Sequence, residues 1–374
     1  MIDRLDPLEA AKEIEGSYKR YLKTLLAPRD EKLATSFDAE VDSSDLLTKG
    51  PILEMTPPYA TGATCRELIA EGVLHPGFAA LDSAALPLDQ PLYIHQEEAI
   101  RKFVAGRNLV VSTGTGSGKT ESFLIPIINH LIAEHAEGRL GPGVRALLLY
   151  PMNALANDQL KRLRALLGAV SEITFGRYTG ETAEDLASAE AKFLQTNPGA
   201  TRLPNELLSR QEMRSAPPHL LLTNYAMLEY LLIRPADLDL FDGPNAGTWR
   251  FIVMDEAHVY DGAQGTEVAL LMRRLKQRVA PESALQCIAT SASLTGSVRN
   301  DPRGEATQFA ANLFDAPFEY RDDDPARQDL VEPVRKSQLT ASQWRLSDDD
   351  LLAFRRGAVD SADLTPNGAD VAAA

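Results

Sequence analysis

The sequence predicts a doubly wound α/β fold, in which a parallel sheet is covered by helices on both faces. Five short apolar runs lie between residues 92 and 315, helical stretches separate them, and each run is followed by a polar or glycine-rich turn. The runs are NLVVS (108–112), RALLLY (145–150), HLLLTN (219–224), RFIVMD (250–255) and LQCIATSAS (285–293). Runs without polar–apolar alternation fit central strands that are buried on both faces. In such sheets ligands bind at the carboxyl ends of the strands, where the polar turns lie.

The length and composition are those of a globular protein with about two domains. The chain has 374 residues, of which 44% are hydrophobic and 24% charged, and its formal net charge is −15. This charge disfavours a protein that coats nucleic acid with its whole surface, but it is compatible with a local basic groove. No apolar stretch approaches the roughly 18 residues of a membrane span, and the acidic start is not a secretory signal. We therefore expect a cytoplasmic protein that does not bind membranes.

The pattern divides the chain into three parts. Residues 1–90 are expected to form a mainly helical accessory segment that begins with an amphipathic helix. The apolar positions of that helix are Ile14, Tyr18, Tyr21, Leu22 and Leu25. Residues 91–315 are expected to form the α/β domain, with an inserted helical or loop segment at 181–217. Residues 316–374 are acidic and weakly patterned, and we expect a weakly structured tail or linker.

A glycine-rich turn follows the first apolar run, in the stretch STGTGSGKTESF (112–123). It stands between a predicted strand and a predicted helix, which is the context of a phosphate-binding loop. The predicted loop residues are Thr115, Gly116, Ser117, Gly118, Lys119 and Thr120. The glycines would let main-chain N–H groups surround a phosphate at the positive end of the helix, Lys119 would reach the β- and γ-phosphate oxygens, and the Thr120 hydroxyl would bind Mg²⁺. The pattern GxxxxGK[ST] is not met strictly, because Thr113 holds its first position, and a flexible glycine turn is the alternative.

An acidic pair ends the strand predicted at 250–255, in the stretch MDEAH (254–258). Two adjacent carboxylates at a strand end are unfavourable unless a cation or a reaction needs them. Asp255 would hold Mg²⁺ through water, and Glu256 would orient and deprotonate an attacking water. The alternative is an acidic strand end that caps the next helix. Together with the glycine-rich turn, the pair predicts hydrolysis of a magnesium–nucleotide complex.

Three motifs carry a resemblance to a known family. STGTGSGKT, DEAH and TSAS (290–293), in this order on successive predicted strands, resemble motifs I, II and III of superfamily 2 DEAD/DEAH-box helicases. The resemblance covers roughly residues 92–315 and implies a RecA-like P-loop NTPase domain with ATP and Mg²⁺ as cofactors. LYIHQEEAI (92–100) resembles the Q-motif, which implies that Gln96 reads the adenine edge. STGTGSGKTESF and YPMNALANDQ (150–159) more closely resemble large RecQ-related bacterial helicases with a C-terminal zinc-binding domain, found in DNA repair and phage defence.

The same resemblance implies a path for a nucleic-acid strand along the sheet edge. YPMNALANDQ resembles motif Ia, TGET (179–182) motif Ib, and LLTNYAMLEYLL (221–232) the next strand-contacting motif. The implied contacts are Pro151, Asn153, Thr179, Gly180, Thr223 and Asn224. Main-chain N–H groups and hydroxyls can hold phosphates without much positive charge. Two basic runs, within 161–164 and 273–278, fit either solvated helix faces or a basic track.

Two further side chains have both a functional and a plain interpretation. The resemblance implies that His258 contacts Ser291 or Ser293 and couples the state of the γ-phosphate to a second domain, whereas an isolated histidine is usually an ordinary surface or core residue. Tyr93 fits either a stack on adenine or a core aromatic position.

The resemblance leads to a prediction about function. Relatives carry a second RecA-like domain with an arginine finger, which is worth about 10³ to 10⁵ in rate, and no such stretch follows residue 293. We therefore expect the ATP-binding motor half of an ATP-dependent DNA helicase or translocase, as a fragment of a larger protein that acts on single-stranded DNA and has possible partner proteins. The alternatives are an RNA-directed motor of the same superfamily and a nucleotide-dependent scaffold that switches partner proteins.

Overall fold

The computed structural model describes residues 7–44, 47, 57–114, 116–280, 285–292 and 301–336. The chain divides into two compact units, residues 1–57 and 58–374. The first unit contains helices α1 (Pro7–Leu25) and α2 (Glu31–Ser43), which pack against each other and are joined by an ion pair of 2.7 Å between Lys23 and Asp42. The helix predicted at the start of the chain is therefore present as α1. No helix among the described residues is both long and apolar enough to cross a membrane.

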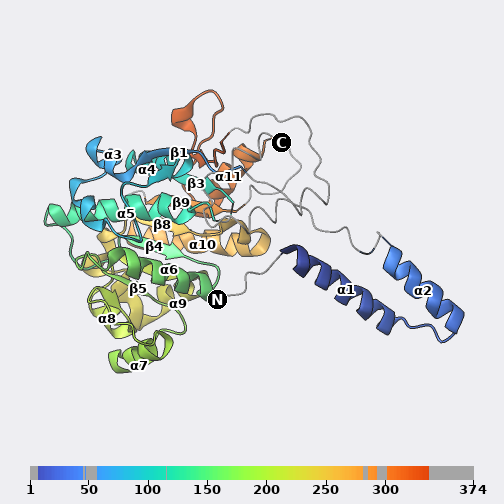
Figure 1. The fold of residues 1–374 in the computed structure, drawn as a ribbon. Helices are drawn as coiled ribbons and strands as arrows, with labels where there is room; N and C mark the ends of the chain where they lie inside the picture. The colour runs from blue at the N-terminus through green and yellow to red at the C-terminus, as the bar shows by residue number, and fades with distance from the viewer. Residues whose placement is uncertain are drawn as a thin grey trace. The chain divides into compact units, whose positions relative to one another are not determined.

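The second unit is built on an eight-stranded sheet whose described strands all run parallel (Figure 1). In sheet order the strands are β10 (Leu330–Val331), β3 (Leu109–Ser112), β9 (Gln286–Ser291), β8 (Phe251–Met254), β4 (Ala146–Leu149), β7 (Leu220–Thr223), β5 (Phe175–Arg177) and β6 (Glu206–Leu207). The five adjacent strands from β3 to β7 coincide with the five predicted apolar runs. The two or three residues of β5, β6 and β10 were not predicted as strands.

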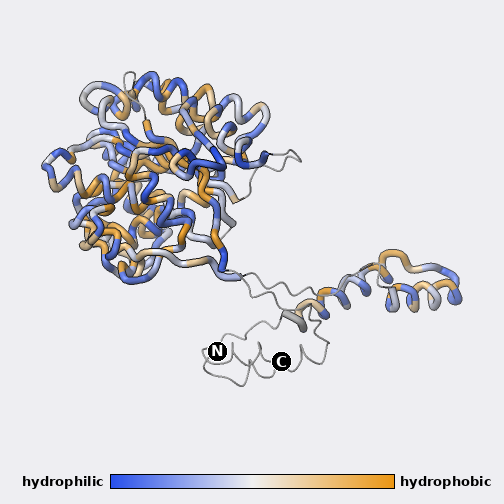
Figure 2. Tube along the Cα trace, turned by 90° about the horizontal axis from the view of Figure 1, so that it is seen from above, coloured by the Kyte–Doolittle hydropathy of each residue, from blue (hydrophilic) through white to orange (hydrophobic). Residues whose placement is uncertain are grey.

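Successive residues of each strand point to opposite faces of the sheet, and both faces are buried. On β3, Leu109 and Val111 belong to one hydrophobic cluster and Val110 to the other. The first cluster includes apolar side chains of α4 (Ile94–Val104), α5 (Lys119–Ala136) and α6 (Asn153–Leu167), and the second those of α9 (Tyr225–Ile233), α10 (Gly262–Val279) and α11 (Pro302–Phe314). In Figure 2 many of the hydrophobic segments run through the middle of this unit. This arrangement confirms the predicted α/β class with helices on both faces.

The segment before the sheet packs on it, so the unit begins at residue 58 and not near residue 90 as we expected. It contains β1 (Thr61–Thr64), α3 (Cys65–Ala70), the 3₁₀ helix η1 (Pro76–Leu81) and β2 (Pro91–Tyr93), which pairs antiparallel with β1. Leu68, Leu74 and Phe78 are fully buried in the first hydrophobic cluster. Because these side chains share one cluster with side chains of α4 and α5, the segment belongs to the core on that face of the sheet.

The first part of the expected tail also joins the sheet. The 3₁₀ helix η5 (Pro325–Arg327) leads into β10, which pairs with β3. Asp329, just before β10, is almost fully buried and forms an ion pair of 2.7 Å with Arg107, just before β3. This pair fixes the start of β10 beside the start of β3. Residues 337–374 of the expected tail lie outside the described residues.

The insertion expected at 181–217 consists of two helices, a short strand and the loops between them. It contains α7 (Leu186–Thr196), the short strand β6 and α8 (Arg210–Ser215). Asn205, immediately before β6, is buried, and its amide donates to three main-chain carbonyl oxygens at 2.9 to 3.1 Å in the stretch that joins α6 to β5. The insertion is thereby tied to the edge of the sheet. Further 3₁₀ helices are η2 (Pro235–Leu240), η3 (Gly243–Thr248) and η4 (Ala257–Val259).

Candidate functional site

The glycine-rich turn connects β3 to α5 at the carboxyl edge of the sheet. Gly116 and Gly118 have φ angles of 75° and 71°, a region that side chains disfavour. Since α5 begins at Lys119, its first main-chain N–H groups have no partner within the helix and point towards the turn. The Ser117 hydroxyl lies inside the turn, 2.6 Å from the Thr113 hydroxyl oxygen. These features are those of a phosphate-binding loop; Thr115 lies outside the described residues.

The lysine of this turn faces the predicted acidic pair. Lys119 Nζ lies 3.1 Å from Glu256 Oε1, and the two side chains are only 11% and 23% exposed. Asp255 is buried next to it, where the hydroxyl of Thr290 donates to Asp255 Oδ1 and accepts from the main-chain N–H of Glu256 at 3.2 Å. Lys119 follows β3, and the two carboxylates follow β8. Only one strand, β9, lies between β3 and β8 in the sheet, so the ammonium and the carboxylates meet at the end of β9, which carries Thr290.

The backbone of Glu256 and the pKa of Asp255 are unusual. Glu256 has a φ of 50°, and it is one of two non-glycine residues in the described chain with a left-handed backbone, which costs roughly 1–2 kcal/mol. Its Oε2 atom is buried, accepts no hydrogen bond from the described part of the chain and lies 3.4 Å from His258 Nδ1. Burial raises the pKa of Asp255. A bound cation would lower that pKa and an ordered water would satisfy Oε2, so the residues present fit a magnesium–nucleotide complex.

Gln96 closes the same loop from α4. Its Oε1 atom accepts from the main-chain N–H of Tyr93 at 2.9 Å, and its Nε2 donates to the Gly118 carbonyl at 3.0 Å. Tyr93 itself packs in an aromatic group with Tyr59 and His95, at ring distances of 5.2 to 5.5 Å. The structure thus places Gln96 and Tyr93 beside the phosphate loop.

Some residues around the loop were missed by sequence reasoning. The Gln159 amide on α6 donates to the Thr120 hydroxyl at 3.3 Å. The Arg335 guanidinium, from the end of the described chain, lies 4.4 Å over the Tyr59 ring. Gln159 occupies the last position of the stretch YPMNALANDQ, so its motif carried a signal. Neither Tyr59 nor Arg335 lies in such a motif, and only the pairing of their segments brings them together.

His258 reaches the end of β9. Its Nδ1 atom lies 3.1 Å from the Ser291 hydroxyl, and the Ser291 carbonyl accepts from the main-chain N–H of Thr113 at 3.1 Å. The end of β9 is therefore in contact both with the acidic motif and with the start of the phosphate loop. Ser293 lies outside the described residues.

The predicted nucleic-acid contacts lie at the carboxyl ends of β4, β5 and β7, which are neighbours in the sheet. Asn224 caps α9 through its Oδ1 and donates at 2.9 Å to Asn153 Oδ1. Asn153 in turn donates to Glu181 Oε1 at 3.3 Å. Gly180 is exposed and Pro151 is half-buried at the same edge. These four predicted positions are exposed or half-buried and lie along the same edge of the sheet.

Two of the predicted contacts face the interior. Thr179 and Thr223 are fully buried. The Thr223 hydroxyl donates to the Tyr178 carbonyl at 2.6 Å, which ties β7 to the end of β5. Both side chains are therefore buried and do not lie on the surface where we expected nucleic-acid contacts, and the Thr223 hydroxyl helps to hold the sheet edge together.

The two basic runs are largely used in ion pairs. On α6, Arg162 pairs with Glu121 and Arg164 binds Glu206 through two nitrogens at 2.7 to 3.0 Å, so only Lys161 points outward, beside Asp158. On α10 the pairs are Arg273 with Asp315, Arg274 with Glu229 and Arg278 with Asp242. Paired arginines of this kind favour structured, solvated helix faces over a continuous basic track.

The chain is similar to several known proteins. Residues 93–301 match the family described as DEAD/DEAH box helicase. Druantia protein DruE from Escherichia coli (strain UMEA 4076-1) is 33% identical over 384 residues, which cover 79% of this chain and 21% of that protein. ATP-dependent helicase Lhr-Core from Methanothermobacter thermautotrophicus is 29% identical over 196 residues, covering 52% of this chain and 21% of that protein. The crystal structure of DUF1998 helicase MrfA bound to DNA has a TM-score of 0.52 and 25% identity, covering 75% of this chain and 30% of MrfA. The chain thus spans about a fifth of the length of the curated relatives it matches.

Proposed function

Since the chain belongs to the DEAD/DEAH box helicase family, we propose that it is the ATP-binding motor half of an ATP-dependent DNA helicase or translocase that moves on single-stranded DNA. The observation that carries the proposal is the approach of Lys119 to Glu256 at 3.1 Å, next to the buried Asp255. The span of about a fifth of its curated relatives supports a role within a longer protein. DNA as the track is supported by MrfA structures solved with DNA and with DNA plus AMPPNP.

The residues of the loop and of the acidic pair have different assigned roles in the binding and hydrolysis of ATP. Gly116, Gly118 and the first turn of α5 would surround the triphosphate with main-chain N–H groups. Lys119 would exchange its carboxylate partner for phosphate oxygens, which frees Glu256. Thr120 and Asp255 would hold Mg²⁺, which neutralises charge on the phosphate oxygens.

Glu256 is placed to act on water. Its Oε2 atom has no hydrogen-bond partner among the residues that the structure describes, so it can accept from a water and orient it. His258 lies between this carboxylate and Ser291, and we assign it the transmission of the phosphate state to the end of β9. Gln96 is assigned to the adenine because its stretch resembles the Q-motif, and its contact with the Gly118 carbonyl places it next to the loop.

The strand would follow the surface formed by Pro151, Asn153, Gly180 and Asn224. These positions offer main-chain groups and amides at the ends of three neighbouring strands. Contacts of this kind hold phosphates without reading base sequence. A motor needs this independence from sequence, because it has to step along any strand.

Binding of Mg-ATP tests the nucleotide part of the proposal. Calorimetry on the full chain should show saturable binding, and Lys119→Ala should weaken it at least tenfold. Lys276→Ala is the matched control, because Lys276 lies on α10 and its Nζ donates to the Asp315 carbonyl at 3.3 Å. Equal affinities for the two variants and the wild type would exclude Lys119 from the site.

Stimulation of ATP hydrolysis by nucleic acids tests whether the motor moves on DNA or on RNA. In the longer protein, single-stranded DNA should raise the ATPase rate more than RNA of the same length, and Glu256→Gln should abolish turnover while Mg-ATP still binds. Stimulation by RNA alone would contradict the assignment of DNA. Unchanged turnover in Glu256→Gln would contradict the assigned role of that carboxylate.

A further inference from the structure

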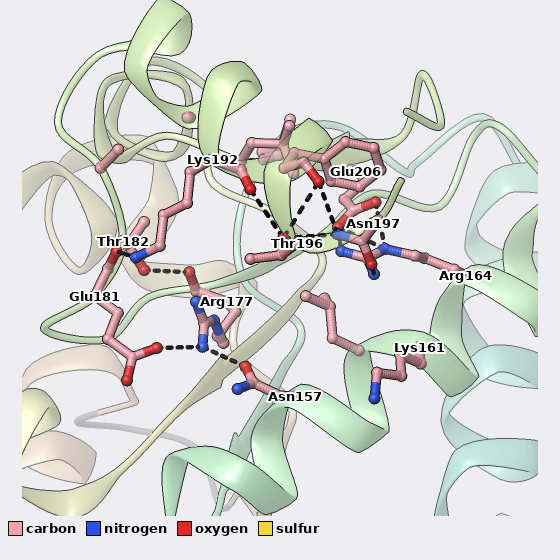
Figure 3. Close-up of a pocket in the computed structure, with 16 residues that line it drawn as sticks. Asn157, Lys161, Arg164, Arg177, Glu181, Thr182, Lys192, Thr196, Asn197 and Glu206 are labelled. Carbon is pink, nitrogen blue, oxygen red and sulfur yellow. Dashed lines mark hydrogen bonds and ion pairs between the residues drawn. The ribbon is translucent and has the colours of Figure 1, made fainter. Parts of the chain in front are cut away.

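A pocket of about 320 Å³ lies away from the phosphate loop, between α6, the end of β5 and the insertion that carries α7 and β6 (Figure 3). Leu160 and Phe193 form part of its apolar wall, and most of the other lining groups are polar or charged. None of the roles assigned above uses this pocket. Its size is within the range of small-ligand sites.

The lining of the pocket is cationic in an acidic protein. Four cations line it, Lys161, Arg164, Arg177 and Lys192, against two carboxylates, Glu181 and Glu206. The pocket therefore has a net charge of +2, whereas the whole chain has a net charge of −15. Such a local reversal of sign favours an anionic ligand.

Arg164 is already satisfied and belongs to the wall. It binds the fully buried Glu206 through two nitrogens and donates to Asn197 Oδ1 at 3.3 Å. Its guanidinium also lies 5.0 Å over the Phe193 ring. The pair of Arg164 and Glu206 is neutral, so the remaining positive charge comes from the other three cations.

Those three cations have donors to spare. Arg177 uses only Nη1, towards Asn157 and towards Glu181 at 3.1 Å, and its Nε and Nη2 have no protein partner in the described part of the chain. Lys192 uses one N–H, towards the Glu181 carbonyl at 2.7 Å. Lys161 is 68% exposed and pairs only with Asp158. Figure 3 shows Arg177 between Asn157 and Glu181, with Lys161 and Lys192 on different sides of the pocket.

The pocket adjoins the surface assigned to the nucleic-acid strand. Glu181 accepts from Arg177 inside the pocket and from Asn153 at the sheet edge. The Thr182 hydroxyl accepts from the Thr179 N–H at 2.9 Å and donates to the Arg177 carbonyl at 2.8 Å. A nucleotide of a bound nucleic-acid strand could therefore reach the pocket by passing over the turn at Gly180, which is exposed.

We propose that this pocket binds the phosphate of a nucleotide, with Arg177, Lys192 and Lys161 as donors. A planar guanidinium and two mobile ammonium groups suit the several acceptor oxygens of a phosphate. The wall formed by Leu160 and Phe193 gives the sugar or base an apolar surface. This nucleotide is either one residue of the bound nucleic-acid strand or a free mononucleotide. The first of these two sources rests on the proposed function.

The test removes the two exposed donors and leaves the fold intact. In Lys161→Gln/Lys192→Gln, binding of fluorescein-labelled oligo(dT) to the full chain is followed by anisotropy over a series of salt concentrations. Arg273→Gln/Arg274→Gln is the matched control, because it removes two positive charges from exposed or half-exposed positions on α10. Retained Mg-ATP binding verifies that both variants are folded and keeps this test separate from the test of the nucleotide site.

The pocket variant should bind oligo(dT) about threefold to tenfold more weakly than the control variant. Its slope of log affinity against log salt should be smaller by about 0.7 for each phosphate that the variant no longer neutralises. Calorimetry with dTMP distinguishes the sources: heat that disappears in the pocket variant identifies a free nucleotide, and a changed slope without such heat identifies a nucleotide of the strand. If the pocket variant matches the control in affinity and slope, and dTMP gives no heat with the wild type, the pocket is not a phosphate site.

Discussion

Thr290→Val isolates the contact that holds the acidic motif in place. Thr290 is fully buried on β9, donates to Asp255 Oδ1 and accepts from the main-chain N–H of Glu256 at 3.2 Å. Valine has nearly the same shape and favours a strand. The substitution therefore removes one hydroxyl and leaves a buried carboxylate oxygen and a half-buried N–H group without this partner.

The size of the effect follows from these two hydrogen bonds. A bond to a charged group contributes about 1.5–3 kcal/mol and a neutral one about 1 kcal/mol, and the added methyl group returns part of this through burial. We expect the free energy of unfolding to fall by about 2–3 kcal/mol, which corresponds to a decrease in Tm of roughly 4–10 °C for a domain of this size. Because the left-handed backbone of Glu256 loses its anchor, Mg-ATP should also bind more weakly.

Thermal unfolding and calorimetry with Mg-ATP measure the two effects. Thr307→Val is the matched control: Thr307 is also buried, but its hydroxyl donates only to main-chain carbonyls of its own helix at 3.0 and 3.2 Å. The control should keep its affinity for Mg-ATP. If Thr290→Val unfolds at the same temperature as Thr307→Val and binds Mg-ATP as tightly, the hydroxyl does not position the acidic pair.

Three further predictions concern other parts of the second unit. Burial lowers the pKa of His219 to about 4, below the usual value of 6.5. As the pH drops from 6.5 towards 4, the unfolded state binds the proton before the folded state does, so the free energy of unfolding should fall by up to about 1.4 kcal/mol per pH unit. Urea denaturation at several pH values measures this fall. Gly118→Ala should weaken Mg-ATP binding more than Gly116→Ala, because a Cβ at 118 would collide with the Gln96 amide, whereas a Cβ at 116 meets open space. Asn205→Ala should lower the free energy of unfolding by about 2–4 kcal/mol, because three buried carbonyl oxygens lose their donor.

Each of these predictions has a control. His219→Gln should reduce the pH dependence between pH 6.5 and 5, and an unchanged dependence would assign it to other groups. Equal affinities of the two glycine variants would mean that the space around the loop is irrelevant. Asn245→Ala removes an amide that donates to one carbonyl at 2.8 Å from a more exposed position; a loss as large as that of Asn205→Ala would refute the importance of burial.

Much of the fold could be predicted because its signals are local. The five central strands from β3 to β7 are continuous apolar runs, since each is buried on both faces. The resemblance to superfamily 2 helicases and the RecA-like fold, predicted from motifs at Lys119, Asp255 and Ser291, are confirmed by the family match and the similar structures. The side-chain roles within the site stay predictions that the experiments above test.

The features that could not be predicted from the sequence depend on contacts between residues that are distant along the chain. β5, β6 and β10 have two or three residues each, too few for a periodic pattern, and they are strands only because a neighbouring strand offers them hydrogen bonds. Likewise, nothing local distinguishes Thr179 and Thr223 from surface residues. Thr223 is buried on β7 beside β4, and its hydroxyl donates to the carbonyl of Tyr178, the residue before Thr179.

The sequence by itself determined the parallel α/β class and located the glycine-rich turn and the acidic pair, because apolar runs and short motifs consist of consecutive residues. Only the tertiary structure decided that Thr290 anchors the acidic pair, that residues 58–90 belong to the core of the sheet, and that Arg177 and Lys192 share a pocket. Those contacts join residues that are not neighbours in the sequence, so they form and stabilise the protein only once the chain has folded.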